Sequence, residues 1–109
     1  MLFLLSTAFA AINVVTTTQD LAALTEAVGG SDVAVTYIAR GDMDPHFVDA
    51  KPSFMVKLAD ANLLVCVGME LEIGWLPSLI TGSRNPKIAP GQPGYLDASN
   101  AIKPIDFLI

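Results

Sequence analysis

The feature that most constrains the fold of this sequence is a run of five apolar residues, Leu63 to Val67, that ends at Gly68. A strand that is apolar at every position, and not only at alternate positions, is typical of a central strand covered on both faces. Two further strands are predicted earlier in the chain, at Ile12 to Val15 and at Val33 to Ala39, because both segments are rich in β-branched residues. We therefore expect a sheet with both faces covered.

A first helix is predicted between the first two of these strands. Leu21, Leu24 and Val28 recur at helical spacing, and the three threonines at 16–18 offer hydroxyls that can cap the start of the helix. Gly29-Gly30 supplies the left-handed residue that commonly ends a helix.

Two more helices and one further strand are expected in the second half of the chain. A short helix is predicted to begin at Pro52 and to continue to Ala59, and a third helix carries the apolar stripe at 75–80 and ends at Gly82. The segment 87–89 is a weak candidate for a last strand. Strands and helices that alternate in this way predict a parallel sheet with helices on both faces, which is an α/β layered domain.

The topology of such a sheet indicates where a ligand would bind. Ligands of parallel α/β sheets bind beyond the carboxyl ends of the strands, which here are the loops at 16–18, 40–53 and 68–74. The second loop contains His46, the only histidine of the chain, directly after Pro45. Neutral imidazole is the commonest protein ligand for zinc, so His46 is a candidate metal ligand. A surface position without function is the competing interpretation.

Acidic residues lie near this histidine and after the central strand. For Asp42 and Asp49 we favour solvated positions in a turn, and Asp44 lies between them. Glu70 and Glu72 follow the central strand, where one of them could orient or bind a ligand. Their ordinary role at the start of a helix would be capping, so their function stays open.

Composition limits the kinds of partner. The chain of 109 residues is long enough for one small domain, and its six basic residues are scattered in a chain with a net charge of −5, which argues against nucleic acid. Apolar residues make up 52% and charged residues 16%, as expected when one face is covered by another lobe.

Cys66 is the only cysteine, so no internal disulfide can form, and its place in the apolar run predicts a buried thiol.

Residues 1–10 resemble the end of a secretory signal peptide. They contain an apolar stretch and then Ala8-Phe9-Ala10, which matches the small-x-small pattern of a cleavage site. A buried first strand is the alternative interpretation. With a signal, the mature chain would begin near Ala11. Because no cysteine follows the signal, the product is expected to be soluble and periplasmic and not anchored to a lipid.

Three segments of the chain together resemble a known family. These segments are Ile12 to Thr18, Asp44-Pro45-His46 followed by Pro52-Ser53, and Gly68 to Leu76. They are similar, in order and spacing, to the periplasmic zinc and manganese solute-binding proteins of ABC transporters, the metal-binding cluster A-I type. The similarity covers nearly all of residues 12–89.

The resemblance implies a Rossmann-like lobe in a two-lobed protein whose lobes are joined by a long helix. The metal would be cargo, Zn²⁺ or Mn²⁺, held in the cleft between the lobes and delivered to an ABC permease, with no enzymatic activity and no organic cofactor. His46 matches the first metal ligand of the family. No later histidine is present, so we expect residues 11–109 to be an N-terminal lobe without its C-terminal lobe, and to bind metal poorly alone.

The sequence leaves two alternatives to metal capture open. One is a Rossmann-like enzyme fragment whose turn at 16–18 binds a phosphate-containing substrate, although the Gly-x-Gly-x-x-Gly fingerprint and the Gly-Lys-Ser/Thr phosphate loop are both missing from the sequence. The other is a structural or adhesion domain that associates with itself through its apolar face.

Overall fold

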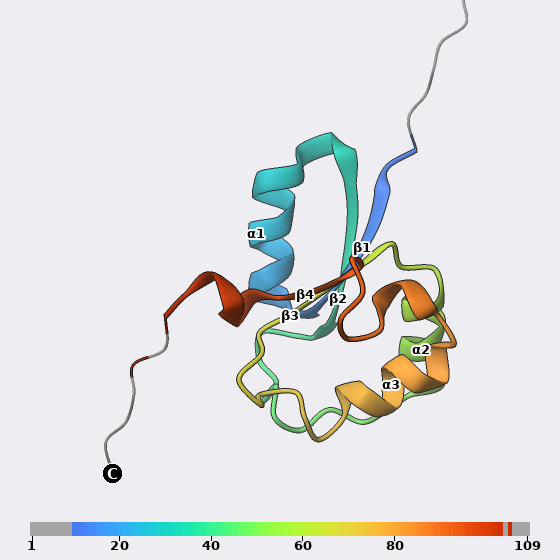
Figure 1. Ribbon diagram of the computed structural model, residues 1–109, viewed down its shortest axis with the longest axis vertical. Coiled ribbons are helices and arrows are strands. Elements are labelled where there is room, and N and C mark those ends of the chain that lie inside the picture. Colours follow the sequence, from blue (N-terminus) through green and yellow to red (C-terminus); the bar gives the residue numbers. More distant parts are fainter. Residues whose placement is uncertain (1–9, 104, 106–109) are drawn as a thin grey trace, which may run out of the picture.

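The computed structural model describes residues 10–103 and 105. Within them, four strands form one parallel sheet in the order β2-β1-β3-β4 (Figure 1). The strands are β1 (Ile12–Thr18), β2 (Val33–Ala39), β3 (Leu63–Cys66) and β4 (Tyr95–Asp97). β1 is central, and its Val15 pairs with Thr36 of β2 and with Leu64 of β3. The predicted parallel sheet is confirmed.

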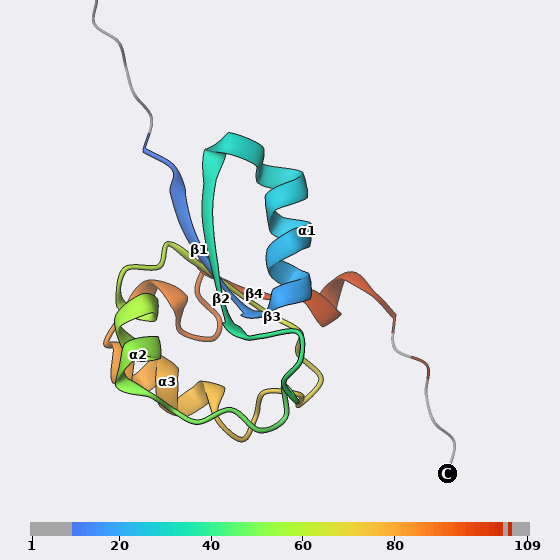
Figure 2. The same ribbon diagram turned by 180° about the vertical axis from the view of Figure 1, so that it is seen from behind.

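Helices cover both faces of this sheet, as the sequence predicted. α1 (Gln19–Gly29) lies on one face, and α2 (Pro52–Ala59) and α3 (Leu76–Ser83) pack against each other on the opposite side (Figures 1 and 2). Three short 3-10 helices complete the described elements: η1 (Gly30–Asp32), η2 (Pro86–Ile88) and η3 (Ala98–Ala101).

The main hydrophobic core lies between the sheet and the pair α2 and α3. Val15 and Leu64 of the sheet meet Leu58 of α2 and Leu79 of α3 there, and all four side chains are buried. Successive strand residues point to opposite faces. Val14, which is also buried, therefore faces α1, whose only buried residue is Ala22.

α1 has the predicted ends but not a buried apolar stripe. The Thr18 hydroxyl accepts a hydrogen bond from the Leu21 amide at 3.2 Å, and Gly30 follows the helix with a φ of 54°. Leu24 and Val28, however, are 63% and 91% exposed. The helix rests on the sheet through the small side chain of Ala22, with Leu21 half-buried and Leu24 and Val28 left outside.

Two predictions in the second half of the chain are wrong. α3 does not end at Gly82 but continues to Ser83, and Arg84 adopts the left-handed conformation with a φ of 54°. Gly82 lies inside the helix, where its missing side chain leaves space for Met55: an added β-carbon would lie 2.5 Å from Met55 Sδ.

The last strand is also displaced from its predicted place. Pro86–Ile88 forms the 3-10 helix η2, which begins where the Asn85 side chain accepts a hydrogen bond from the Lys87 amide at 3.1 Å. The strand is Tyr95–Asp97, which pairs with β3 after Gly94. Pro86 has no amide hydrogen for a strand ladder, and this favours the turn over the strand.

The proposed signal segment at 1–10 lies almost wholly outside the described residues. Among the residues that are described, no helix is both long enough and apolar enough to cross a membrane.

The cysteine is buried as predicted, which leads to a simple chemical test. Cys66 is 1% exposed, and its Sγ lies 3.3 Å from the Tyr95 hydroxyl. Burial raises the pKa of the Cys66 thiol to about 11. At pH 8 we therefore expect Ellman's reagent to leave the folded chain unmodified and to react with one thiol per chain in urea, because the thiolate is the reactive form. Rapid modification without urea would contradict the buried position.

Candidate functional site

Two of the three loops predicted to carry the ligand, 40–53 and 68–74, follow the carboxyl ends of strands, whereas the predicted loop at 16–18 is instead the last part of β1. The Thr17 hydroxyl at the end of β1 donates a hydrogen bond of 2.6 Å to Glu72 Oε2 in the loop after β3. The Trp75 indole N–H donates a hydrogen bond of 2.8 Å to the carbonyl oxygen of Pro45 in the loop after β2. These two contacts join the end of β1 and the loop after β2 to the segment between β3 and α3.

Glu72 is the buried polar centre of this arrangement. Its side chain is 4% exposed and accepts three hydrogen bonds, from the Thr17 hydroxyl and from the amides of Val67 and Gly68 at 2.6 and 3.0 Å. The carboxylate thereby joins the ends of β1 and β3. The sequence left the role of Glu72 open, and the structure shows that its carboxylate positions the ends of β1 and β3.

The turn that brings Glu72 inward has an unusual backbone. Gly68, Met69 and Glu70 have φ values of 84°, 52° and 67°, so three consecutive residues are left-handed. Glycine is required at the first position, since a β-carbon would overlap the Asp97 carboxylate. The turn leaves the Glu70 side chain exposed, while Glu72 is buried two residues later.

Trp75 anchors the loop that carries the histidine. Its side chain is 3% exposed, and the indole N–H donates to the carbonyl of Pro45, the residue before His46. Gly74 also approaches this loop, since a β-carbon at Gly74 would lie 3.8 Å from the His46 carbonyl oxygen. The backbone directly before His46 is therefore held by a buried side chain.

Asp44 orients the His46 ring. One carboxylate oxygen, Oδ1, accepts a hydrogen bond from the His46 amide at 3.0 Å and lies 2.7 Å from His46 Nδ1. These bonds, first the one from the amide and then the one from the ring, hold the pKa of Asp44 below its ordinary value. A carboxylate beside Nδ1 favours the tautomer that donates from Nδ1 and leaves the lone pair of Nε2 for a metal ion.

His46 is accessible to such an ion. The side chains of His46 and Asp44 are 60% and 57% exposed. Asp42 forms an exposed ion pair with Arg40 at 3.3 Å, and Asp49 is exposed, in agreement with their predicted place in a solvated turn. Across residues 10–103 and 105, no group of three or more His, Cys, Asp or Glu side chains is placed to hold a metal ion.

The segment 16–18 is the end of β1 and not a phosphate-binding turn. Thr16 and Thr17 are fully buried, and their hydroxyls donate to the Thr18 carbonyl and to Glu72. A phosphate needs free donors, so the alternative of an enzyme that binds phosphate through this turn is not supported.

A family model shows which protein family the chain belongs to. A family model described as the periplasmic component A of a zinc-uptake complex, ZnuA, matches residues 14–106. The chain belongs to this family. No curated protein sequence matches the chain. The ZnuA family is a metal-binding, periplasmic component of transport, and the chain has the fold expected for it.

Solved structures agree with the ZnuA assignment. A crystal structure of ZnuA superposes with a TM-score of 0.64 at 28% identity, over 70% of this chain and 30% of that chain. A zinc-bound deletion mutant of ZnuA gives the same score and identity over 70% and 29%. A manganese-bound periplasmic metal-binding protein from Candidatus Liberibacter asiaticus has a TM-score of 0.60 at 21% identity, over 64% and 26%, and shows the fold alone. The chain thus spans less than a third of these structures.

Two contacts of the site were missed in the sequence. The pairing of Asp44 with His46 could have been inferred from their spacing, because an aspartate two residues before a histidine commonly accepts a local hydrogen bond from the backbone. The contact of Trp75 with Pro45 joins residues 30 positions apart and has no local signal.

Proposed function

We propose that this chain is the N-terminal lobe of a protein that captures a divalent metal ion, Zn²⁺ or Mn²⁺, and delivers it to an ABC permease. The main observation that supports the proposal is the orientation of His46. Its Nδ1 atom lies 2.7 Å from Asp44 Oδ1, on a loop that follows the carboxyl end of β2 in a chain of the ZnuA family. The neighbouring structures are described as zinc-bound in one case and manganese-bound in another, so both metals remain candidates.

The chemistry proposed for the site is coordination without a covalent step. His46 would bind through Nε2, and Asp44 would keep the ring in the required orientation. Zinc takes about four protein or water ligands, so the remaining ligands would come from a second lobe. No catalytic residue and no organic cofactor is assigned.

Apolar side chains near His46 support a lobe that packs on this end of the sheet. Phe47 follows the histidine and is 80% exposed, and Met69 and Ile73 of the loop after β3 are 60% and 67% exposed. All three lie on loops that follow the carboxyl ends of strands, where a covering lobe would bury them. We propose that the C-terminal lobe covers them.

The proposal includes the domain limits and the location. Residues 1–10 would be a secretory signal and residues 11–109 the lobe itself. The protein would act in the periplasm, with the membrane permease as its partner.

The test compares this chain with the longer protein encoded by the same reading frame. The longer protein is expected to bind one Zn²⁺ or Mn²⁺ per molecule, and this chain to bind about a thousandfold more weakly, because most ligands would be missing. Competition with a chromogenic chelator measures both affinities. Equal affinities, or a longer protein that binds neither metal, would refute the proposal.

A further inference from the structure

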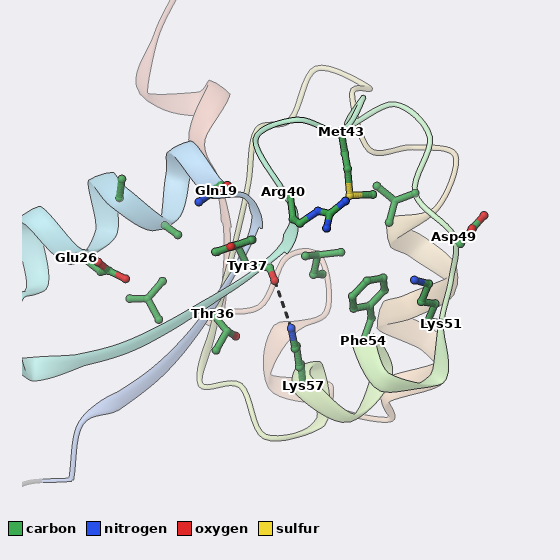
Figure 3. Close-up of a pocket in the computed structure, with 15 residues that line it drawn as sticks. Gln19, Glu26, Thr36, Tyr37, Arg40, Met43, Asp49, Lys51, Phe54 and Lys57 are labelled. Carbon is green, nitrogen blue, oxygen red and sulfur yellow. Dashed lines mark hydrogen bonds between the residues drawn. The ribbon is translucent and has the colours of Figure 1, made fainter.

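A cavity lies away from the histidine, along the outer edge of β2. Its volume is about 720 Å³, which is within the range of small-molecule sites, and it is bounded by α1, β2, the loop after β2 and α2 (Figure 3). β2 is an edge strand, since it pairs only with β1 in the described sheet. His46 is not among the lining residues, so the cavity is separate from the proposed metal site.

One end of the cavity gathers positive charge around an aromatic ring. Arg40, Lys51 and Lys57 line this end, and they are three of the six basic residues in a chain with a net charge of −5. The Nζ atoms of Lys51 and Lys57 lie 5.8 and 5.7 Å from the centre of the Phe54 ring. Figure 3 shows Arg40, Lys51 and Lys57 grouped about Phe54.

This charge is only partly neutralised by the protein. Of the three cations, only Arg40 forms an ion pair within the described residues, and it uses Nε to contact Asp42, which leaves its terminal nitrogens for a ligand. Two acids also line the cavity. Glu26 lies on α1 at the far end, and the Asp49 side chain points away from Phe54 in Figure 3.

The other walls of the cavity are largely apolar. Ala22 of α1, Val35 of β2 and Val48 of the loop after β2 line it together with Phe54, and Ala22 and Val48 are buried. A cavity with apolar walls and a few convergent charged groups suits a ligand that has both an apolar part and a charge of opposite sign.

We propose that this cavity binds a small organic anion, with a carboxylate or phosphate carried on an apolar or aromatic body. The anionic group contacts Arg40 and Lys57, and the body lies against Phe54. Addition of a peptide strand to β2 fits less well. Lys57 Nζ already donates a hydrogen bond of 3.5 Å to the carbonyl oxygen of Tyr37, and a lysine beside an edge strand opposes strand pairing.

Phenylphosphate is the probe for a direct test, since it combines a ring with a phosphate. In an amide NMR titration of the full chain, we expect shifts centred on Arg40, Phe54 and the edge of β2. Lys57→Gln should weaken binding about tenfold, the equivalent of one charge-assisted hydrogen bond. Benzoate in place of phenylphosphate distinguishes a carboxylate site from a phosphate site.

The matched control is Lys87→Gln, which removes the same charge from an exposed position outside the cavity. This variant should keep the affinity of the unmodified chain. Inorganic phosphate, which has the charge without the ring, and benzyl alcohol, which has the ring without the charge, should each bind more weakly. Equal losses in the two lysine variants, equal binding of inorganic phosphate, or no shift at the cavity would each overturn the proposal.

Discussion

Replacing Glu72 with alanine is expected to lower the free energy of unfolding by about 3–5 kcal/mol, the largest effect of any single polar substitution in this site. The substitution leaves three donors without a partner, the Thr17 hydroxyl and the amides of Val67 and Gly68, at a position that is 4% exposed. Urea denaturation followed through the fluorescence of Trp75, the only tryptophan, measures the change.

Two matched glutamine substitutions distinguish the stability lost with a buried carboxylate from the stability lost with a negative charge alone. Glu72→Gln keeps the size of the side chain but turns an NH₂ group toward donors, so a loss of about 2–3 kcal/mol is expected. Glu70→Gln removes the same charge from an exposed side chain in the same turn and should change the stability by less than about 0.5 kcal/mol. Equal losses in the two variants would contradict the role assigned to Glu72.

Elements with strong local patterns were predictable from the sequence. β2 is Val33–Ala39 and α2 is Pro52–Ala59, as predicted, because a β-branched run and a proline at the start of a helix act through adjacent residues. The buried strand that begins at Leu63 was identified for a similar reason, since five apolar residues in a row need cover on both faces.

Elements that depend on distant contacts were not predictable. The three-residue strand Tyr95–Asp97 exists because β3 offers an edge for pairing, and three residues carry no periodic signal of their own. The end of α3 was misplaced because Gly82 resembles a stop, whereas it lies inside the helix beside Met55.

The location of the site was predictable from the sequence, but the contacts between its side chains were not. Parallel topology alone brought the loops at 40–53 and 68–74 to one edge of the sheet, where the structure has them. Glu70 and Glu72, by contrast, could not be told apart in the sequence. The left-handed turn at Gly68, Met69 and Glu70 decides which of the two is buried.

If His46 is a metal ligand as proposed, His46→Ala in the complete protein is expected to weaken zinc binding at least about a hundredfold, since it removes one of about four ligands. Asp44→Asn should weaken binding about tenfold. The histidine ligand remains, but its ring loses the carboxylate that orients Nδ1 at 2.7 Å, and such supporting groups are commonly worth 10- to 100-fold. Competition titration with a zinc chelator gives all the affinities on one scale.

Asp42→Asn is the matched control, because Asp42 lies on the same loop, carries the same charge and contacts Arg40 and not His46. If long-range attraction between the loop and the cation dominates, Asp42→Asn and Asp44→Asn lose affinity equally, and both losses shrink at high salt. If Asp44 acts through the ring, only Asp44→Asn loses affinity and the loss persists in salt. We expect the second pattern, because the hydrogen bonds to Asp44 are local and the charge of Asp42 is already balanced by Arg40.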